Sequence, residues 1–183
     1  MPNLIQIHQK KISIGDKYTI SVNGMQVLKC ARSLFKLYPV LTVSPTMGGP
    51  AVFEIEQRLA IFRPMYVFTF GANKYELTTV SWWKRHYRIL MGQDVFDIYG
   101  HRGRKVSVFL NGRQVAWFQS AAVTFFSGDE YTIHADAQVS VDWLIAIALF
   151  WDSYYNRGNK SMININFGSL LQAQPFDKNW IPA

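Results

Sequence analysis

One segment near the end of the chain constrains the fold more than any other, because it contains no polar residue. Nine apolar residues lie between Asp142 and Asp152. Ser140 is placed to cap a helix that begins here, and a helix that is apolar on every side must be buried on every side. Nine residues are far fewer than the roughly twenty that a membrane-spanning helix needs. We therefore predict a buried core helix, and not a membrane span, at about residues 141–156.

Most of the chain before this helix has the pattern of β-strands. Residues 18–22 and 106–110 place apolar side chains at alternate positions, which is the period of a half-buried strand. Each segment is followed by an Asn-Gly pair, at Asn23-Gly24 and at Asn111-Gly112. Asn-Gly is a strong hairpin signal because both turn positions must accept a positive φ. Short strands with regularly spaced turns predict a sandwich or a barrel, and closure into a barrel would remove exposed edges.

The prolines and loops indicate a single domain. Pro39 and Pro64 each precede a β-rich run, and proline belongs at strand starts or edges because it lacks an amide donor. Residues 44–50 are nearly all turn formers and predict a loop, but similar strand patterns flank them. The length of 183 residues also favours one domain. We assign residues 1–160 to one domain and residues 161–183 to a C-terminal extension.

The extension has a mixed pattern. Residues 162–168 alternate like one more strand. From Gln172 onward we expect an irregular tail, in which Phe176 and Trp180 are candidate anchors for a protein partner or a second copy of the chain.

Composition makes the chain basic. It has 19 Lys and Arg against 12 Asp and Glu, for a formal net charge of +7, and 49% hydrophobic residues exclude disorder as its dominant state. A basic surface suits an anionic partner such as nucleic acid, acidic lipid or an acidic protein. Cys30 is the only cysteine, which excludes an internal disulfide. The first residues lack the pattern of a signal peptide, so we expect a cytoplasmic protein, either free or peripheral at a membrane.

The sequence carries no recognisable catalytic or metal-binding motif. The four histidines lie far apart and have no metal-ligand spacing: His8, His86, His101 and His134. Nucleophile elbows, phosphate-binding loops and dinucleotide fingerprints do not occur. Glu54 and Glu56 alternate on one solvated strand face, and Asp94 and Asp97 are expected to flank a turn. We predict that the chain is not an enzyme and holds no metal or cofactor.

Two segments, residues 82–88 and 101–105, combine basic and aromatic side chains. Their candidate contacts with an anionic surface are Lys84, Arg85, Arg88, Arg102, Arg104 and Lys105, with Trp82 or Trp83 as an interfacial anchor. Cations interleaved with aromatics suit lipid head groups, stacked bases or a membrane interface. The alternative is a barrel strand with tryptophan facing the core and cations facing solvent. Residues 100–103 match a GxxG phosphate clamp, but that clamp needs helices on both sides, and strand patterns flank it here.

Residues 97–106, 115–118, 129–134 and 141–155 together resemble the tubby-like barrel, and most closely its LURP-one-related and phospholipid-scramblase branch. Residues 97–106 resemble a hairpin of that family, residues 115–118 with 129–134 resemble its closing strands, and residues 141–155 match its terminal helix. The likeness covers most of residues 12–157. It implies a closed barrel of about a dozen strands around a hydrophobic helix, without established enzymatic chemistry.

The resemblance also implies a class of ligand. Tubby proteins bind phosphoinositide head groups at a basic surface site, and scramblases are membrane-associated proteins with an acidic calcium segment beside the terminal helix. The matching residues here, 152–157, contain one carboxylate and one cation, whereas calcium needs six or more oxygen ligands. We therefore expect binding to phospholipid or phosphoinositide head groups without calcium-dependent scrambling. The alternatives are a protein-interaction or oligomerisation module and, less favoured, nucleic-acid binding through the basic clusters.

Overall fold

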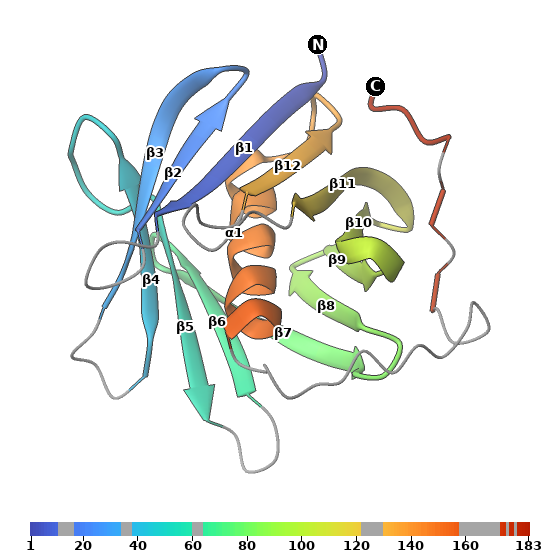
Figure 1. Ribbon diagram of the computed structural model, residues 1–183. Helices are drawn as coiled ribbons and strands as arrows, with labels where there is room; N and C mark the ends of the chain where they lie inside the picture. The colour runs from blue at the N-terminus through green and yellow to red at the C-terminus, as the bar shows by residue number, and fades with distance from the viewer. Residues whose placement is uncertain are drawn as a thin grey trace.

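A computed structural model of the chain describes residues 1–10, 17–33, 38–59, 64–121, 130–157, 173–174, 176–177 and 179–183. In this part of the chain, twelve antiparallel strands form a closed barrel around a helix (Figure 1). This confirms the predicted mainly-β fold. The strands are β1 (Asn3–Lys10), β2 (Lys17–Val22), β3 (Met25–Arg32), β4 (Val40–Pro45), β5 (Phe53–Leu59), β6 (Pro64–Phe70), β7 (Asn73–Ser81), β8 (His86–Met91), β9 (Asp94–Gly100), β10 (Lys105–Leu110), β11 (Arg113–Ala121) and β12 (Glu130–Ala135).

Each strand pairs with the next one along the chain, and β1 closes the barrel by pairing with β12. Ile5 lies opposite Ile133 across this closure, and both side chains are fully buried. The pairing leaves every described strand with two neighbours, so the barrel has no open edge to pair with another chain.

The up-and-down order gives the barrel two distinct ends. At one end, here called the turn end, lie the connections at residues 23–24, 46–52, 71–72, 92–93 and 111–112. Both predicted Asn-Gly hairpins are confirmed there: Asn23 and Asn111 have φ of 50° and 52°, and their glycines have φ of 83° and 79°. Only residues that tolerate the left-handed region fit such turns.

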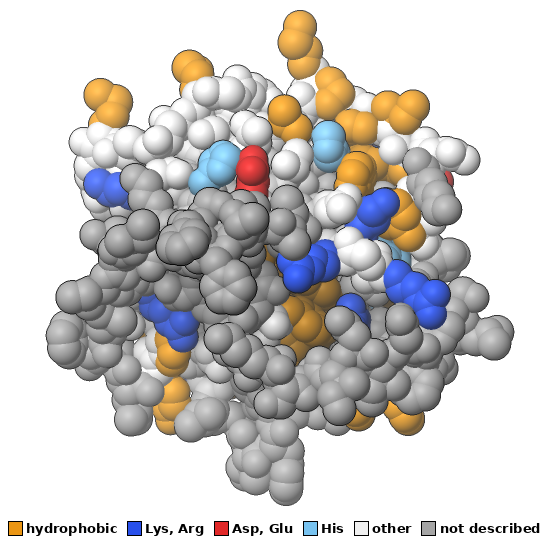
Figure 2. All heavy atoms as spheres, viewed as in Figure 1, with side chains coloured by type: hydrophobic (Ala, Val, Ile, Leu, Met, Phe, Trp, Pro, Cys, Tyr) orange, Lys and Arg blue, Asp and Glu red, His pale blue; other side chains and the backbone are white. Residues whose placement is uncertain are grey.

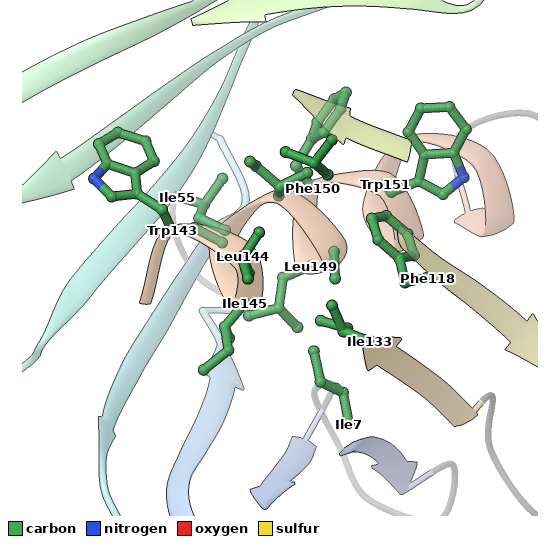
Figure 3. Close-up of a cluster of buried hydrophobic side chains, with 14 of the residues drawn as sticks. Ile7, Ile55, Phe118, Ile133, Trp143, Leu144, Ile145, Leu149, Phe150 and Trp151 are labelled. Carbon is green, nitrogen blue, oxygen red and sulfur yellow. The ribbon is translucent and has the colours of Figure 1, made fainter. Parts of the chain in front are cut away.

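The helix α1 (Val141–Asp152) begins at the turn end and runs down the barrel lumen. Its residues from Trp143 to Asp152 are all buried. Figure 3 shows Leu144, Leu149 and Phe150 of this helix within the cluster of buried hydrophobic side chains. About eight strands make a barrel that side chains alone can fill, so a wider barrel needs an additional element in its lumen. A helix with its side chains is about 10–12 Å across and provides that filling. The all-apolar segment is therefore buried by the sheet that surrounds it.

The ends of the helix differ slightly from the expectation. Ser140 occupies the N-cap position, but its side chain makes no capping hydrogen bond. At the other end α1 stops at Asp152, and residues Ser153–Arg157 continue as a π-helical turn, η2. Pro64 is the first residue of β6 as predicted, and Pro39 lies directly before β4. The predicted loop at 44–50 begins two residues late because Ser44 and Pro45 belong to β4. The strand expected at 162–168 lies outside the described residues.

Candidate functional site

The two basic clusters lie next to each other at the end of the barrel where α1 ends. The first forms the four-residue turn Trp82–Arg85 between β7 and β8, and the second forms the short 3-10 helix η1 (Arg102–Arg104) after β9. Strands β8 and β9 are hydrogen-bonded neighbours, and the Gly100 amide donates to the Arg85 carbonyl oxygen at 2.9 Å. We call the residues 82–85 and 102–105 the basic end. Antiparallel pairing thus joins two clusters that are some twenty residues apart in the sequence.

The turn presents two tryptophans to solvent. Trp82 is 47% exposed and Trp83 is 74% exposed, and their rings stack with centroids 5.8 Å apart and planes within 4°. The Arg85 amide donates to the Trp82 carbonyl oxygen at 3.2 Å, and Arg85 itself has a φ of 50°. The alternative in which these tryptophans face the core is wrong, because a turn interrupts the strand alternation here. Contiguous exposed apolar surface is a feature of interaction sites, which makes this turn a candidate.

Arg85 connects the turn to the core helix. Its guanidinium carbon lies 5.5 Å from the ring centroid of Tyr155, in the turn that continues α1. The Tyr155 and Tyr87 hydroxyl oxygens are 2.6 Å apart, and burial raises the pKa of both tyrosines. A cation near a helix C-terminus is also favoured by the helix dipole. Arg85 therefore holds the turn in place and is only half-exposed.

Arg88 is engaged within the barrel wall. Its guanidinium donates to both carboxylate oxygens of Asp97, at 2.9 and 3.1 Å, and His86 Nε2 lies 2.6 Å from the same carboxylate. Burial alone would raise the pKa of Asp97, but the hydrogen bonds and charges of Arg88 and His86 outweigh burial and lower it. Asp97 was expected to flank a turn, but the turn lies at residues 92–93, directly before Asp94. Asp97 therefore lies inside β9, opposite Arg88. We therefore leave Arg88 out of the candidate surface.

The remaining cations divide into free and occupied ones. Lys84, Arg102 and Arg104 are exposed, and none of them forms an ion pair with an acidic residue in the described part of the chain. Lys105 is half-buried, with its amine 4.9 Å from the ring centroid of Phe176 and 5.9 Å from that of Trp117. On the face shown in Figure 2, described Lys and Arg side chains are prominent and acidic ones are sparse. The free cations and the stacked indoles make the basic end the best candidate binding surface.

The core also contains a buried polar cluster that no sequence motif indicated. The Asp152 carboxylate is fully buried and accepts hydrogen bonds from the hydroxyls of Tyr18, on β2, and Tyr131, on β12. Burial, followed by the nearby Asp152 charge, raises the pKa of both Tyr18 and the Cys30 thiol. The sequence did offer one signal, because Asp152 directly follows nine apolar residues. A closed barrel that encloses those nine residues also encloses the carboxylate next to them. Full burial gives a substrate no access, so the cluster is structural.

The described residues contain no group of three or more side chains suited to hold a metal ion. The histidines have separate neighbours: His8 with Glu130, His86 with Asp97, His101 with Ser107, and His134 with Trp117. Glu54 and Glu56 lie on the outer side of β5, as predicted, with Glu56 paired to Arg58.

No helix in the described part of the chain is long and apolar enough to cross a membrane. Comparison with protein-family models, curated proteins and solved structures finds no match to the chain.

Proposed function

We propose that the chain is a non-enzymatic, peripheral membrane protein that binds anionic phospholipid head groups through its basic end. The observation that carries this proposal is the stacked, exposed pair Trp82 and Trp83 beside three exposed cations that have no acidic partner among the described residues: Lys84, Arg102 and Arg104. Tryptophan prefers the interface between membrane and water, where its ring is partly apolar and its N–H remains hydrated.

Charge and burial would act together in such attachment. Each Lys or Arg close to an anionic membrane contributes about 1 kcal/mol, so the three free cations contribute about 3 kcal/mol. Those contacts draw the barrel to the surface, and the indoles then insert at head-group depth. The contacts of Arg85 with Gly100 and Tyr155 hold the turn against the barrel. The turn therefore loses little conformational entropy when the tryptophans insert.

The resemblance to the tubby-like barrel supports the same proposal. A closed barrel around a hydrophobic helix is the architecture that this resemblance implies, and we propose membership of its LURP-one-related and scramblase-like branch on the quoted sequence segments. A phosphoinositide is then one candidate head group. A cytoplasmic location follows from the same proposal, since the cytoplasmic leaflet carries most of the anionic lipid.

Sedimentation with vesicles tests the proposal. Wild-type protein should sediment with vesicles that contain phosphatidylserine and stay in solution with phosphatidylcholine alone, and added salt should weaken its binding. Replacing Lys84, Arg102 and Arg104 together by alanine should weaken binding about 100-fold, from about 1 kcal/mol per cation. Trp82→Ala combined with Trp83→Ala should remove binding that persists at high salt.

Two exposed residues at the turn end provide matched controls. Lys74→Glu changes an exposed cation, and Met47→Ala removes an exposed apolar side chain, both far from the basic end. Both variants should bind vesicles like the wild type. Absence of vesicle binding by the wild type refutes the proposal, and equal losses in the controls refute the assignment to the basic end. Salt-sensitive binding to single-stranded oligonucleotides, without vesicle binding, would favour nucleic acid instead.

A further inference from the structure

The outer wall of the barrel carries a covered notch beside the basic end. Ser107 on β10 lies between two buried valines and therefore points outward, yet it is fully buried. Its cross-strand neighbours are Tyr99 and Trp117, whose large side chains flank the small serine. His101 is also buried, and its Nε2 lies 2.6 Å from the Ser107 hydroxyl. An outward-facing polar residue is excluded from solvent only where another part of the protein covers it.

Phe176 is part of this cover. Its ring centroid lies 5.1 Å from that of His101 and 5.8 Å from that of Trp117, and the Lys105 amine lies 4.9 Å from the Phe176 ring centroid. Phe176 was expected to anchor a partner or a second copy, and in this structure it packs on its own barrel. The cation of Lys105 faces two aromatic rings, an arrangement that ring quadrupoles favour.

The same segment is fixed a second time at the turn end. The Ala183 amide donates to Asp136 Oδ1 at 2.7 Å, and the Ala137 amide donates to the Ala183 carbonyl oxygen at 3.0 Å. Arg113 holds the other carboxylate oxygen of Asp136 at 2.8 Å. We call residues 176–177 and 179–183 the strap; they pass along the barrel beside β10 and β11, as the red segment in Figure 1 shows.

We infer that the strap is an intramolecular ligand that masks Lys105 and competes with anionic lipid for the basic end. Lys105 directly follows Arg104 and belongs to the same charged surface. While Phe176 covers it, the Lys105 amine is held against the wall and is withheld from phosphate. Release of the strap adds a fourth free cation and exposes Trp117. This inference rests on the proposed membrane function. It predicts that the wild-type protein binds vesicles less tightly than a variant whose strap is released from Lys105.

Two measurements on the full-length chain test the inference, each with Phe176→Ala as the variant. The first is the rate of Lys105 acetylation by a water-soluble active ester, read by mass spectrometry, with exposed Lys84 as the internal reference. The variant should raise the Lys105 rate about two- to fivefold, the factor that one cation–π contact at an exposed site supports. Ile181→Ala is the matched control, because Ile181 belongs to the strap but is 81% exposed.

The second measurement is binding to phosphatidylserine vesicles. Phe176→Ala should bind about fivefold more tightly than the wild type, because one more cation reaches the surface. An unchanged Lys105 rate overturns the masking. A changed rate with equal vesicle binding by the wild type and Phe176→Ala overturns the competition and leaves the proposed function standing. If neither protein binds vesicles, the proposed function fails, and the competition, which rests on it, fails with it. Light scattering tests whether the strap docks on a second copy instead. If the wild type is a dimer and Phe176→Ala is a monomer, the strap docks on a second copy and the inference is overturned.

Discussion

Replacing Gly100 by alanine tests how closely the wall of the barrel packs on the core helix. A Cβ at this position would clash with the ring of Trp151, near the end of α1, and would lie 2.8 Å from the Arg85 Cβ. The φ of Gly100 lies outside the left-handed region, so alanine can adopt the backbone conformation, and the clash is the main effect. The glycine is therefore required by space and not by the turn.

The structure sets the size of the effect. Overpacking in a well-packed core costs about 1–3 kcal/mol, and the upper part of that range applies because Trp151 belongs to a helix enclosed on all sides. Replacing glycine by alanine returns about 0.4–1 kcal/mol, because the unfolded chain loses freedom. We expect Gly100→Ala to lower the free energy of unfolding by about 2 kcal/mol. For a chain of this length, Tm should fall by about 4–8 °C.

A double-mutant cycle identifies the cause. Thermal and urea unfolding of Gly100→Ala should be compared in the wild-type background and with Trp151→Leu, which shortens the opposing side chain. The cost of the alanine should fall to less than half in the second background, because only the Arg85 contact remains. Gly103→Asn is the control, since Gly103 has a φ of 72° and open space around its Cβ direction, so asparagine should be nearly neutral. Equal costs of Gly100→Ala in both backgrounds would refute the packing argument.

Three further predictions concern buried or paired groups. Asp152→Leu should destabilise the fold by about 2–6 kcal/mol in urea unfolding, because two buried tyrosine hydroxyls lose their acceptor at about 1–3 kcal/mol each, and a loss below 1 kcal/mol would contradict that role. Cys30, whose pKa is raised by burial, should react with a thiol reagent only in denaturant; rapid reaction of the folded protein would contradict its placement. The lowered pKa of Asp97 stabilises the fold above the unfolded-state pKa of about 3.9, and this contribution is lost as pH falls through the lower folded-state value. Asp97→Asn should flatten this acid branch of the stability profile, and an unchanged branch would show that its pairs with Arg88 and His86 contribute nothing there.

Local sequence rules predicted the elements of this fold well. The Asn-Gly pairs at 23–24 and 111–112 formed hairpins because only a few residue types accept two successive positive φ values. The strand start at Pro64, and the start of β4 directly after Pro39, also followed from the residue itself, since proline lacks an amide donor. Asp97 was placed wrongly, because its position in β9 depends on its pairing with Arg88 on another strand.

The candidate surface could be predicted only in part. Its cations and tryptophans were found as local clusters in the sequence. Which of the cations have partners elsewhere in the fold could not be predicted from the sequence. Arg88 is not available to bind an anionic ligand because it pairs with Asp97, nine residues further along the chain. Lys105 is not available because it packs against Phe176, seventy-one residues away. Such partners are set by strand register and by the path of the strap.

The sequence alone determined that the chain forms short strands, tight hairpins and one helix that must be fully enclosed, because propensity, turn chemistry and hydrophobic period act between near neighbours. The tertiary structure decided what depends on distant pairing. Closure of β1 on β12 brings Tyr18 and Tyr131 to the Asp152 carboxylate, and antiparallel order brings residues 82–85 and 102–105 to one end. Those contacts join residues across long chain separations, and no local pattern encodes which strand a given strand will meet.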